Sequence, residues 1–163
     1  MSGRAVDQQT LLIIVETVLR IGFGLRFLTS GISNIRRWPN PVRNAELVFP
    51  FGTKFFGAVA VFLMVGGAAG LILGLATRTA ALMIALFLLP TLKIQSYWLK
   101  TLPGMIEDVR DAVGEAARPK FQRIARAAYH SHETAWQANV LFILLALYFA
   151  IRGSVAFGLD NLF

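Results

Sequence analysis

The chain has 163 residues, of which 56% are hydrophobic and only 15% are charged. Soluble domains average about 45–50% apolar and about 25% charged residues, so this composition indicates a membrane protein. The absence of cysteine excludes a disulfide scaffold, a Cys-ligated iron–sulfur cluster, a zinc ribbon and a cysteine nucleophile within this chain. No nucleic-acid-binding motif accompanies the net charge of +7, so we expect no nucleic-acid partner.

Four segments are long and apolar enough to cross a bilayer, which takes about 20 helical residues. They are residues 11–34, 55–77, 79–98 and 134–152. Only residues 76–79 separate the second segment from the third, so these two must pair antiparallel. We therefore predict one all-α integral-membrane domain over residues 1–163, an antiparallel bundle of four transmembrane helices. A cleaved signal peptide is the alternative for the first segment, but its internal charges and the lack of an A-x-A-like site argue against it.

The connection between the third and fourth segments, residues 100–133, is amphipathic. Apolar residues recur on one helical face before Pro119 and again after it, and this proline should break or kink a helix. The two sets are Ile106, Val109, Val113 and Ala116, then Phe121, Ile124, Ala125 and Ala128. We predict two short amphipathic helices that lie on the membrane surface as an insert in the bundle. A cap over the helix ends or a docking surface for another subunit fits the pattern equally well. A basic cluster suited to anionic lipid lies in this insert: Arg118, Lys120, Arg123 and Arg126.

Basic residues predict the orientation in the membrane. The loops between spans one and two and between spans three and four carry ten of them: Arg36, Arg37, Arg43, Lys54, Lys100, Arg110, Arg118, Lys120, Arg123 and Arg126. The opposite side carries three: Arg4, Arg78 and Arg152. The positive-inside rule then predicts that both longer loops are cytoplasmic and that both termini lie outside. Trp38, Trp98 and Trp136 fall at span ends on the loop side, where aromatic rings prefer the headgroup level.

Four ionisable residues fall inside the predicted spans, where each costs roughly 2.5–3.5 kcal/mol at a helix centre. They are Glu16, Arg20, Arg26 and Lys93. Glu16 and Arg20 are four residues apart, so they can neutralise each other on one helix face. That face also carries a polar and aromatic stripe: Phe23, Phe27, Ser30, Gly31 and Asn34. Charge neutralisation and the lining of a ligand pocket explain this stripe equally well. Arg26 and Lys93 can instead extend to the headgroups.

A polar pocket at the loop-side membrane face is the second prediction. Lys93 and Gln95 near the end of span three and Gln137 and Asn139 at the start of span four bring hydrogen-bonding groups to one level. A quinone carbonyl needs such a donor beside an apolar channel, and so does a lipid headgroup. The candidate ligand-binding residues are Glu16, Arg20, Arg26, Lys93, Gln95 and Asn139.

Other motifs give weaker indications. His130 and His132 lie outside the predicted spans next to Glu133, and we predict no metal site from them. No catalytic set is identified, and no covalently bound cofactor is predicted. A ridge of small residues on span two permits close contact between helices: Gly66, Gly67, Gly70 and Gly74.

Several short motifs together resemble the DoxX family of small four-helix membrane proteins. Span one contains Leu19-Arg20, Phe27-Leu28 and Ser30-Gly31-Ile32-Ser33. Span two and the following turn contain Gly66-Gly67 and Gly74-Leu75-Ala76-Thr77-Arg78. The chain ends in a Gly-rich stretch with the pair Leu159-Asp160. The resemblance covers residues 11–98 and 134–163 and leaves the amphipathic insert unmatched.

The resemblance implies a subunit of a larger assembly in a bacterial or archaeal cytoplasmic membrane. The family is named after a subunit associated with a thiosulfate:quinone oxidoreductase, which implies a place near the quinone pool and protein partners. At most, the chain is then one subunit of a membrane oxidoreductase that holds a quinone or lipid. Two alternatives stay open: a non-catalytic structural or assembly subunit that anchors a partner, and a small-solute carrier that uses the polar stripe.

Overall fold

A computed structural model describes residues 7–162, and all regular secondary structure in this range is helical. The helices are α1 (Gln8–Arg36), α2 (Asn40–Glu46), α3 (Thr53–Leu73), α4 (Thr77–Arg110) and α5 (Arg118–Arg152), with short 3-10 turns η1 (Glu115–Ala117) and η2 (Leu159–Asn161). The predicted all-helical class is confirmed.

Three of the long helices in the described range are apolar enough to cross a membrane. They are α3, α4, and α5 together with the turn before it. The protein is therefore a multi-pass integral membrane protein. Helix α1 is long enough to span the bilayer, but its apolar run contains Glu16, Arg20 and Arg26. Its crossing of the bilayer stays a prediction.

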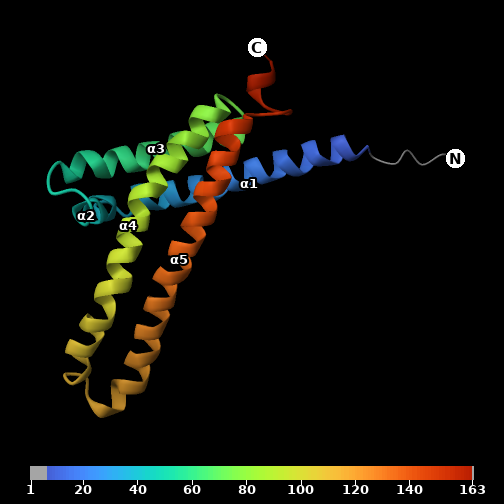
Figure 1. Cartoon of the computed structure of the whole chain (residues 1–163). Coiled ribbons are helices and arrows are strands. Elements are labelled where there is room, and N and C mark those ends of the chain that lie inside the picture. The colour runs from blue at the N-terminus through green and yellow to red at the C-terminus, as the bar shows by residue number, and fades with distance from the viewer. Residues whose placement is uncertain (1–6, 163) are drawn as a thin grey trace.

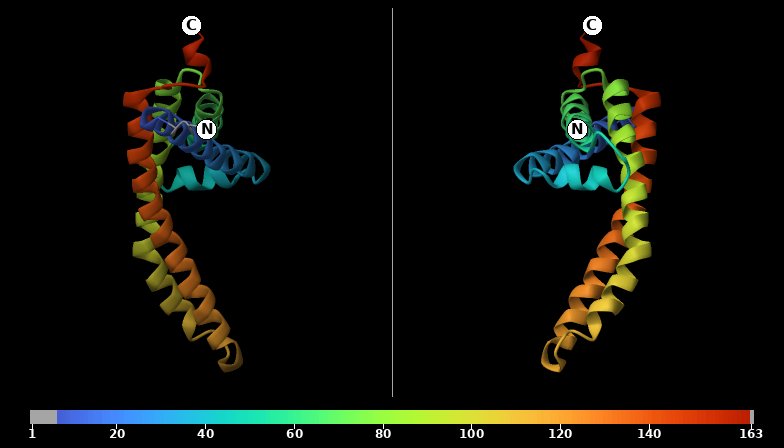
Figure 2. Two further views of the ribbon diagram at one scale, coloured as in Figure 1. Left: turned by 90° about the vertical axis from the view of Figure 1, so that its right-hand side faces the viewer. Right: turned by 90° about the vertical axis from the view of Figure 1, so that its left-hand side faces the viewer.

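The helices are arranged as two antiparallel pairs. Helix α1 packs along α3, α4 packs along α5, and α3 contacts α4. The α1–α3 pair lies across the α4–α5 hairpin, as Figures 1 and 2 show, so the arrangement differs from a bundle of four nearly parallel helices. A tight turn joins the pairs: Gly74 and Ala76 both have positive φ angles, 61° and 46°. This turn reverses the chain within three residues and lets α4 leave α3 at a steep angle.

Residues 100–133 are not a pair of separate short helices. The first half of this segment continues α4 to Arg110, and the second half is the beginning of α5. Pro119 does not break a helix, because it lies in the first turn of α5, where its missing N–H group is not needed. Pro103 is accommodated inside α4. We call residues 100–133 the arm, since they project from the remaining helices as an antiparallel hairpin (Figure 2).

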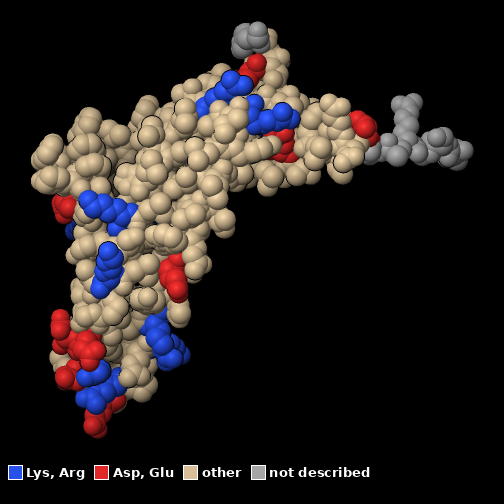
Figure 3. Space-filling model, viewed as in Figure 1, with Lys and Arg blue, Asp and Glu red and all other residues tan. Residues whose placement is uncertain are grey.

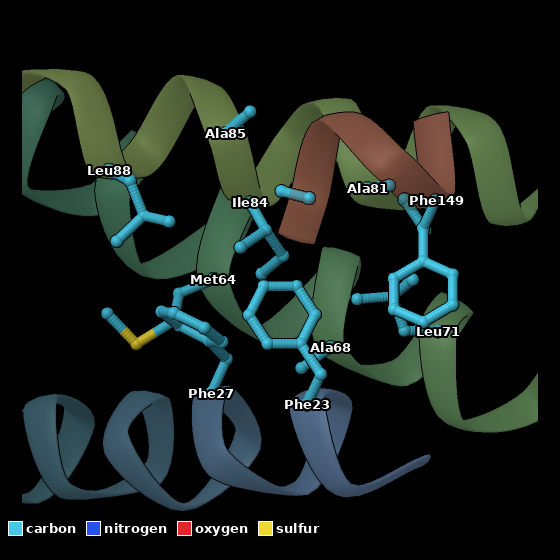
Figure 4. Packing of buried hydrophobic residues seen from close by; sticks show 12 residues of the cluster. Phe23, Phe27, Met64, Ala68, Leu71, Ala81, Ile84, Ala85, Leu88 and Phe149 are labelled. Carbon is cyan, nitrogen blue, oxygen red and sulfur yellow. The ribbon is translucent and has the colours of Figure 1, made fainter. Parts of the chain in front are cut away.

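The hydrophobic core lies where the two helix pairs cross (Figure 4). Phe23 stacks on Phe149 of α5, with ring centroids 6.3 Å apart, and meets Phe27 edge-on at 5.1 Å. Buried residues of α3 and α4 complete this core: Met64, Ala68, Leu71, Ala80, Ala81, Ile84, Ala85 and Leu88. All four long helices therefore contribute to one core.

Three glycines of the predicted ridge, Gly66, Gly67 and Gly70, face α4, whereas Gly74 lies beyond α3 and faces Arg20 and Gly158. A Cβ atom on Gly67 would lie 2.8 Å from the carbonyl oxygen of Ala80, and one on Gly70 would lie 2.7 Å from the Ala80 side chain. Glycine is needed here because the two backbones approach closely. The same device, which the sequence analysis did not identify, lets α1 approach α3: a Cβ on Gly24 would lie 2.7 Å from Ile72.

Candidate functional site

Arg20 is almost completely buried, with 2% of its surface exposed. Its Nη1 donates to the carbonyl oxygen of Leu71 at 2.5 Å, and its Nη2 donates to the carbonyl oxygen of Phe157 at 2.9 Å. One guanidinium therefore joins α1, the end of α3 and the C-terminal segment. Such charge-assisted bonds replace the water that the buried cation has lost.

Glu16 does not pair with Arg20, so the charge neutralisation that the sequence left open as one of two explanations is not formed. Its carboxylate lies 3.4 Å from Nε of Arg152, at the end of α5. The i, i+4 spacing allows the two side chains to meet, but the guanidinium of Arg20 is directed to backbone carbonyls instead. Glu16 thus helps to join α1 to α5.

Asp160 caps the first turn of α4 from the C-terminal segment. Its Oδ1 accepts from the N–H of Ala76 at 2.6 Å, and its Oδ2 accepts from the N–H of Thr77 at 2.9 Å. A carboxylate at a helix N-terminus satisfies free N–H donors and the helix dipole. Burial tends to raise the pKa of Asp160, but the bonds from Thr77 and Ala76 and the charge of Arg20 outweigh it, so the pKa lies below its ordinary value.

Gly74 lets these groups meet. Its φ of 61° is unfavourable for other residues, and a Cβ there would lie 2.5 Å from both Nη1 of Arg20 and the Cα of Gly158. We call Arg20, Gly74, Phe157 and Asp160 the clasp. It brings together three motifs that the sequence analysis singled out separately: Leu19-Arg20, Gly74 to Arg78 and Leu159-Asp160. The side chains of Arg20 and Asp160 bond to backbone groups of other segments, so the clasp has the geometry of a structural link between helices.

A second polar cluster lies nearer to the arm, in a cavity of about 310 Å³. We call this cavity the polar pocket. Its polar lining comes from α1, α4 and α5: Arg26, Ser30, Ser33, Asn34, Thr91, Gln95 and Asn139. Its apolar lining includes three aromatic rings, Phe27, Phe87 and Phe142.

Hydrogen bonds orient the side chains around the polar pocket. Asn139 Nδ2 donates to the hydroxyl of Thr91 at 3.0 Å, and the Arg26 guanidinium donates to the hydroxyl of Ser30. Nδ1 of His132 lies 2.7 Å from the side-chain amide oxygen, Oε1, of Gln95. Because that oxygen can only accept, Nδ1 carries the proton, and the amide N–H groups of Gln95 are left to donate elsewhere.

The six predicted ligand-binding residues therefore fall in three places. Arg26, Gln95 and Asn139 line the polar pocket. Glu16 and Arg20 lie at the clasp end of the molecule. Lys93 is directed away from both, with its Nζ 3.5 Å from the carbonyl oxygen of Val48. His132 bonds to Gln95 of the polar pocket, but the sequence did not predict this contact. The pattern of one helix cannot show which α4 residue faces His132 of α5.

A second cavity, of about 230 Å³, adjoins the polar pocket. We call it the apolar cavity. It shares Asn34, Phe87 and Thr91 with the polar pocket and extends between α2, α3 and α4. The rest of its lining is almost entirely apolar: Pro41, Ala45, Val48, Phe49, Phe56, Val59, Ala60, Val61, Leu63, Leu86, Pro90 and Ile94, with Asn44.

Comparison with known protein families assigns the chain to one family. The DoxX family model matches residues 15–97, which are 83 of the 163 residues. The protein belongs to the DoxX family. No curated protein and no solved structure gave a match. The matched part of this DoxX protein contains Arg20 and Gly74 of the clasp and Arg26 and Gln95 of the polar pocket, whereas Asn139 and Asp160 lie beyond it. The resemblance of residues 134–163 to the family stays a prediction.

Proposed function

We propose that this DoxX protein binds a membrane quinone, with the quinone ring in the polar pocket and the isoprenoid tail in the apolar cavity. One observation carries the proposal: a cavity lined by hydrogen-bond donors adjoins a cavity lined by aliphatic and aromatic side chains. A molecule with a small polar head and a long apolar tail has this same division. Small-molecule sites generally combine an apolar lining with a few placed polar groups.

The residues present fit a quinone ring. Its two carbonyl oxygens are acceptors, and Arg26, Gln95 and Asn139 carry N–H donors on three different helices. The rings of Phe27, Phe87 and Phe142 offer surfaces for packing against the flat ring. The cavity of about 310 Å³ lies at the lower end of the range of ligand pockets, about 300–1,000 Å³.

We further propose that the chain acts as one subunit of a membrane oxidoreductase. A bound quinone supplies two-electron redox chemistry, and the residues of this chain hold and orient it. The chain has no cysteine to ligate an iron–sulfur cluster. A flavin or metal centre in a partner subunit would therefore exchange electrons with the quinone, while this subunit provides the site in the membrane.

The proposal predicts that quinone binding depends on the polar pocket. The protein is purified in mild detergent, its bound lipids are extracted and identified by mass spectrometry, and the stripped protein is titrated with decylubiquinone. We expect quinone in the extract. Gln95→Leu and Asn139→Leu should each weaken decylubiquinone binding about tenfold, or about 1.4 kcal/mol, because each removes a half-buried hydrogen-bond donor.

Lys100→Gln is the matched control, since Lys100 lies on the same helix as Gln95 but is exposed and lines neither cavity. It should bind decylubiquinone like the unmodified chain. Equal affinity in all four proteins would refute a quinone site in this pocket. Recovery of a phospholipid that decylubiquinone does not displace would assign the pocket to a lipid headgroup instead.

A further inference from the structure

The arm has almost no core of its own. Of residues 100–133, only Ala125 is buried, and two helices pair there without a third element across them. Figure 2 shows that α1 and α3 do not reach this part of the hairpin. Helices in water owe most of their stability to packing of an apolar face. A two-helix arm therefore needs a further surface to cover its apolar side chains.

The arm has two different faces. The first face carries a pocket between the two helices. Gln122, Arg126 and His130 of α5 line one side of this pocket, and Pro103 and Ile106 of α4 line the other side. A residue two positions along a helix is rotated by about 200°, so it lies nearly opposite its predecessor.

Met105 and Ile124 occupy the opposite face. Met105 follows Pro103 by two residues and Ile124 follows Gln122 by two, so both side chains point away from the pocket on the same side of the hairpin. They are large, apolar and well exposed, at 51% and 59%. Val109 is also exposed and lies one turn further along α4 than Met105. We call Met105, Val109 and Ile124 the apolar face of the arm.

The margins of the apolar face carry opposite charges. Asp108 follows Ile106 by two residues, which places it beside the apolar face on α4. Lys120 precedes Gln122 by two residues, which places it beside the apolar face on α5. The arm half of α5 carries four basic residues and one acidic residue, whereas that of α4 carries two of each sign. Both signs of charge are visible toward the far end of the arm in Figure 3.

We infer that the apolar face pairs with the same face of a second copy of this chain. A two-fold axis parallel to the arm places α4 of each copy on α5 of the other, which makes an antiparallel four-helix bundle. Acidic Asp108 of one copy then lies near basic Lys120 of the other. Both copies keep the same orientation in the membrane. An anionic lipid surface fits less well, because it would meet the acidic margin as well as the basic one.

Cross-linking tests this pairing directly, because the chain has no native cysteine. Ile106 and Gln122 line the same pocket, so their neighbours Met105 and Ile124 lie at similar positions along the length of the arm. Rotation about an axis parallel to the arm does not change these positions. Met105 of one copy therefore lies beside Ile124 of the other. Differently tagged Met105→Cys and Ile124→Cys chains are co-expressed and oxidised in native membranes. We expect a disulfide-linked heterodimer. Gln122→Cys in place of Ile124→Cys is the control from the opposite face and should give none.

Charge reversal provides a second measurement, by native mass spectrometry in mild detergent. Asp108→Lys or Lys120→Asp should each raise the dimer dissociation constant about two- to fivefold, and the double variant should restore it. Equal cross-linking by Gln122→Cys and Ile124→Cys, or a monomer at all concentrations, would overturn the inference. A third outcome would also overturn the inference: a fluorophore attached to the Ile124→Cys variant is quenched by brominated lipid. That result would show that the apolar face lies in the bilayer. None of these outcomes depends on quinone binding.

Discussion

Asp160 is the residue whose ionisation the structure links most directly to stability. It lies outside the spans and caps α4 through both carboxylate oxygens. Because its pKa is lower in the folded protein than the ordinary value of 3.8, its carboxylate stabilises the fold above that value. This contribution is lost as the pH falls through the folded-state pKa. We therefore predict that Tm in detergent falls more steeply with acidification below about pH 4 than it does without this carboxylate.

Asp160→Asn tests this point. The amide keeps one acceptor oxygen but loses the charge and the second acceptor, so the free energy of unfolding at neutral pH should fall by about 0.5–2 kcal/mol. The acid-dependent part of Tm should shrink with it. Asp111→Asn, at the exposed end of α4, is the control and should change neither quantity. Identical pH profiles for Asp160→Asn and the unmodified chain would contradict the capping role.

At the same scale, sequence reasoning found the ionisable and polar residues but only partly their partners. Of the four residues expected to form one polar pocket, Gln95 and Asn139 line the same cavity, whereas Lys93 and Gln137 do not, and Arg26 joins the lining instead. Helical spacing could not show that Arg20 reaches the carbonyl of Phe157, because that contact joins residues 137 positions apart. Backbone carbonyls carry no signal in the side-chain pattern, so such bonds become visible only with the fold.

Among the elements, α3 and the arm respond oppositely to the same substitution of glycine by alanine. Gly67→Ala would place a Cβ 2.8 Å from the Ala80 carbonyl oxygen, so α3 and α4 would have to separate. Overpacking of this kind costs about 1–3 kcal/mol. A Cβ on Gly104, inside α4, would meet nothing within 4 Å. Gly104→Ala should therefore stabilise the helix by about 0.5–1 kcal/mol.

The two variants serve as controls for each other in one thermal-unfolding experiment. We expect a lower Tm for Gly67→Ala and an unchanged or higher Tm for Gly104→Ala. An unchanged Tm for Gly67→Ala would mean that the contact between α3 and α4 is looser than the structure shows.

The helices themselves were largely predictable, because long apolar runs leave little choice of structure in a bilayer. The arm was not. Pro119 and the polar composition of residues 100–133 favoured separate surface helices, yet the proline begins α5 and therefore interrupts nothing. The crossing of the two helix pairs was also missed, since it depends on the tight turn at Gly74 and Ala76 and on which glycines face which helix.

In the whole molecule, charged side chains concentrate at two ends, the arm and the C-terminal segment. Figure 3 shows charged side chains along the arm and around the C-terminal end, with a largely uncharged surface between them. The arm carries much of the positive charge that the sequence assigns to one side of the membrane. Transmembrane proteins keep most of their basic loop residues in the cytoplasm. We therefore predict that the arm is cytoplasmic and that the turn between α3 and α4 faces outward.

Single-cysteine labelling in intact cells tests this orientation. Gly114→Cys is suited to the arm tip because a Cβ there meets nothing within 4 Å, and Thr79→Cys reports the opposite end from an exposed position at the start of α4. A membrane-impermeant maleimide should label Thr79→Cys in intact cells and Gly114→Cys only after permeabilisation. The reverse pattern would place the arm outside the cell. For the proposed quinone-binding function, the orientation also decides from which side of the membrane a redox partner would approach the polar pocket, because that pocket lies on the arm side of the core.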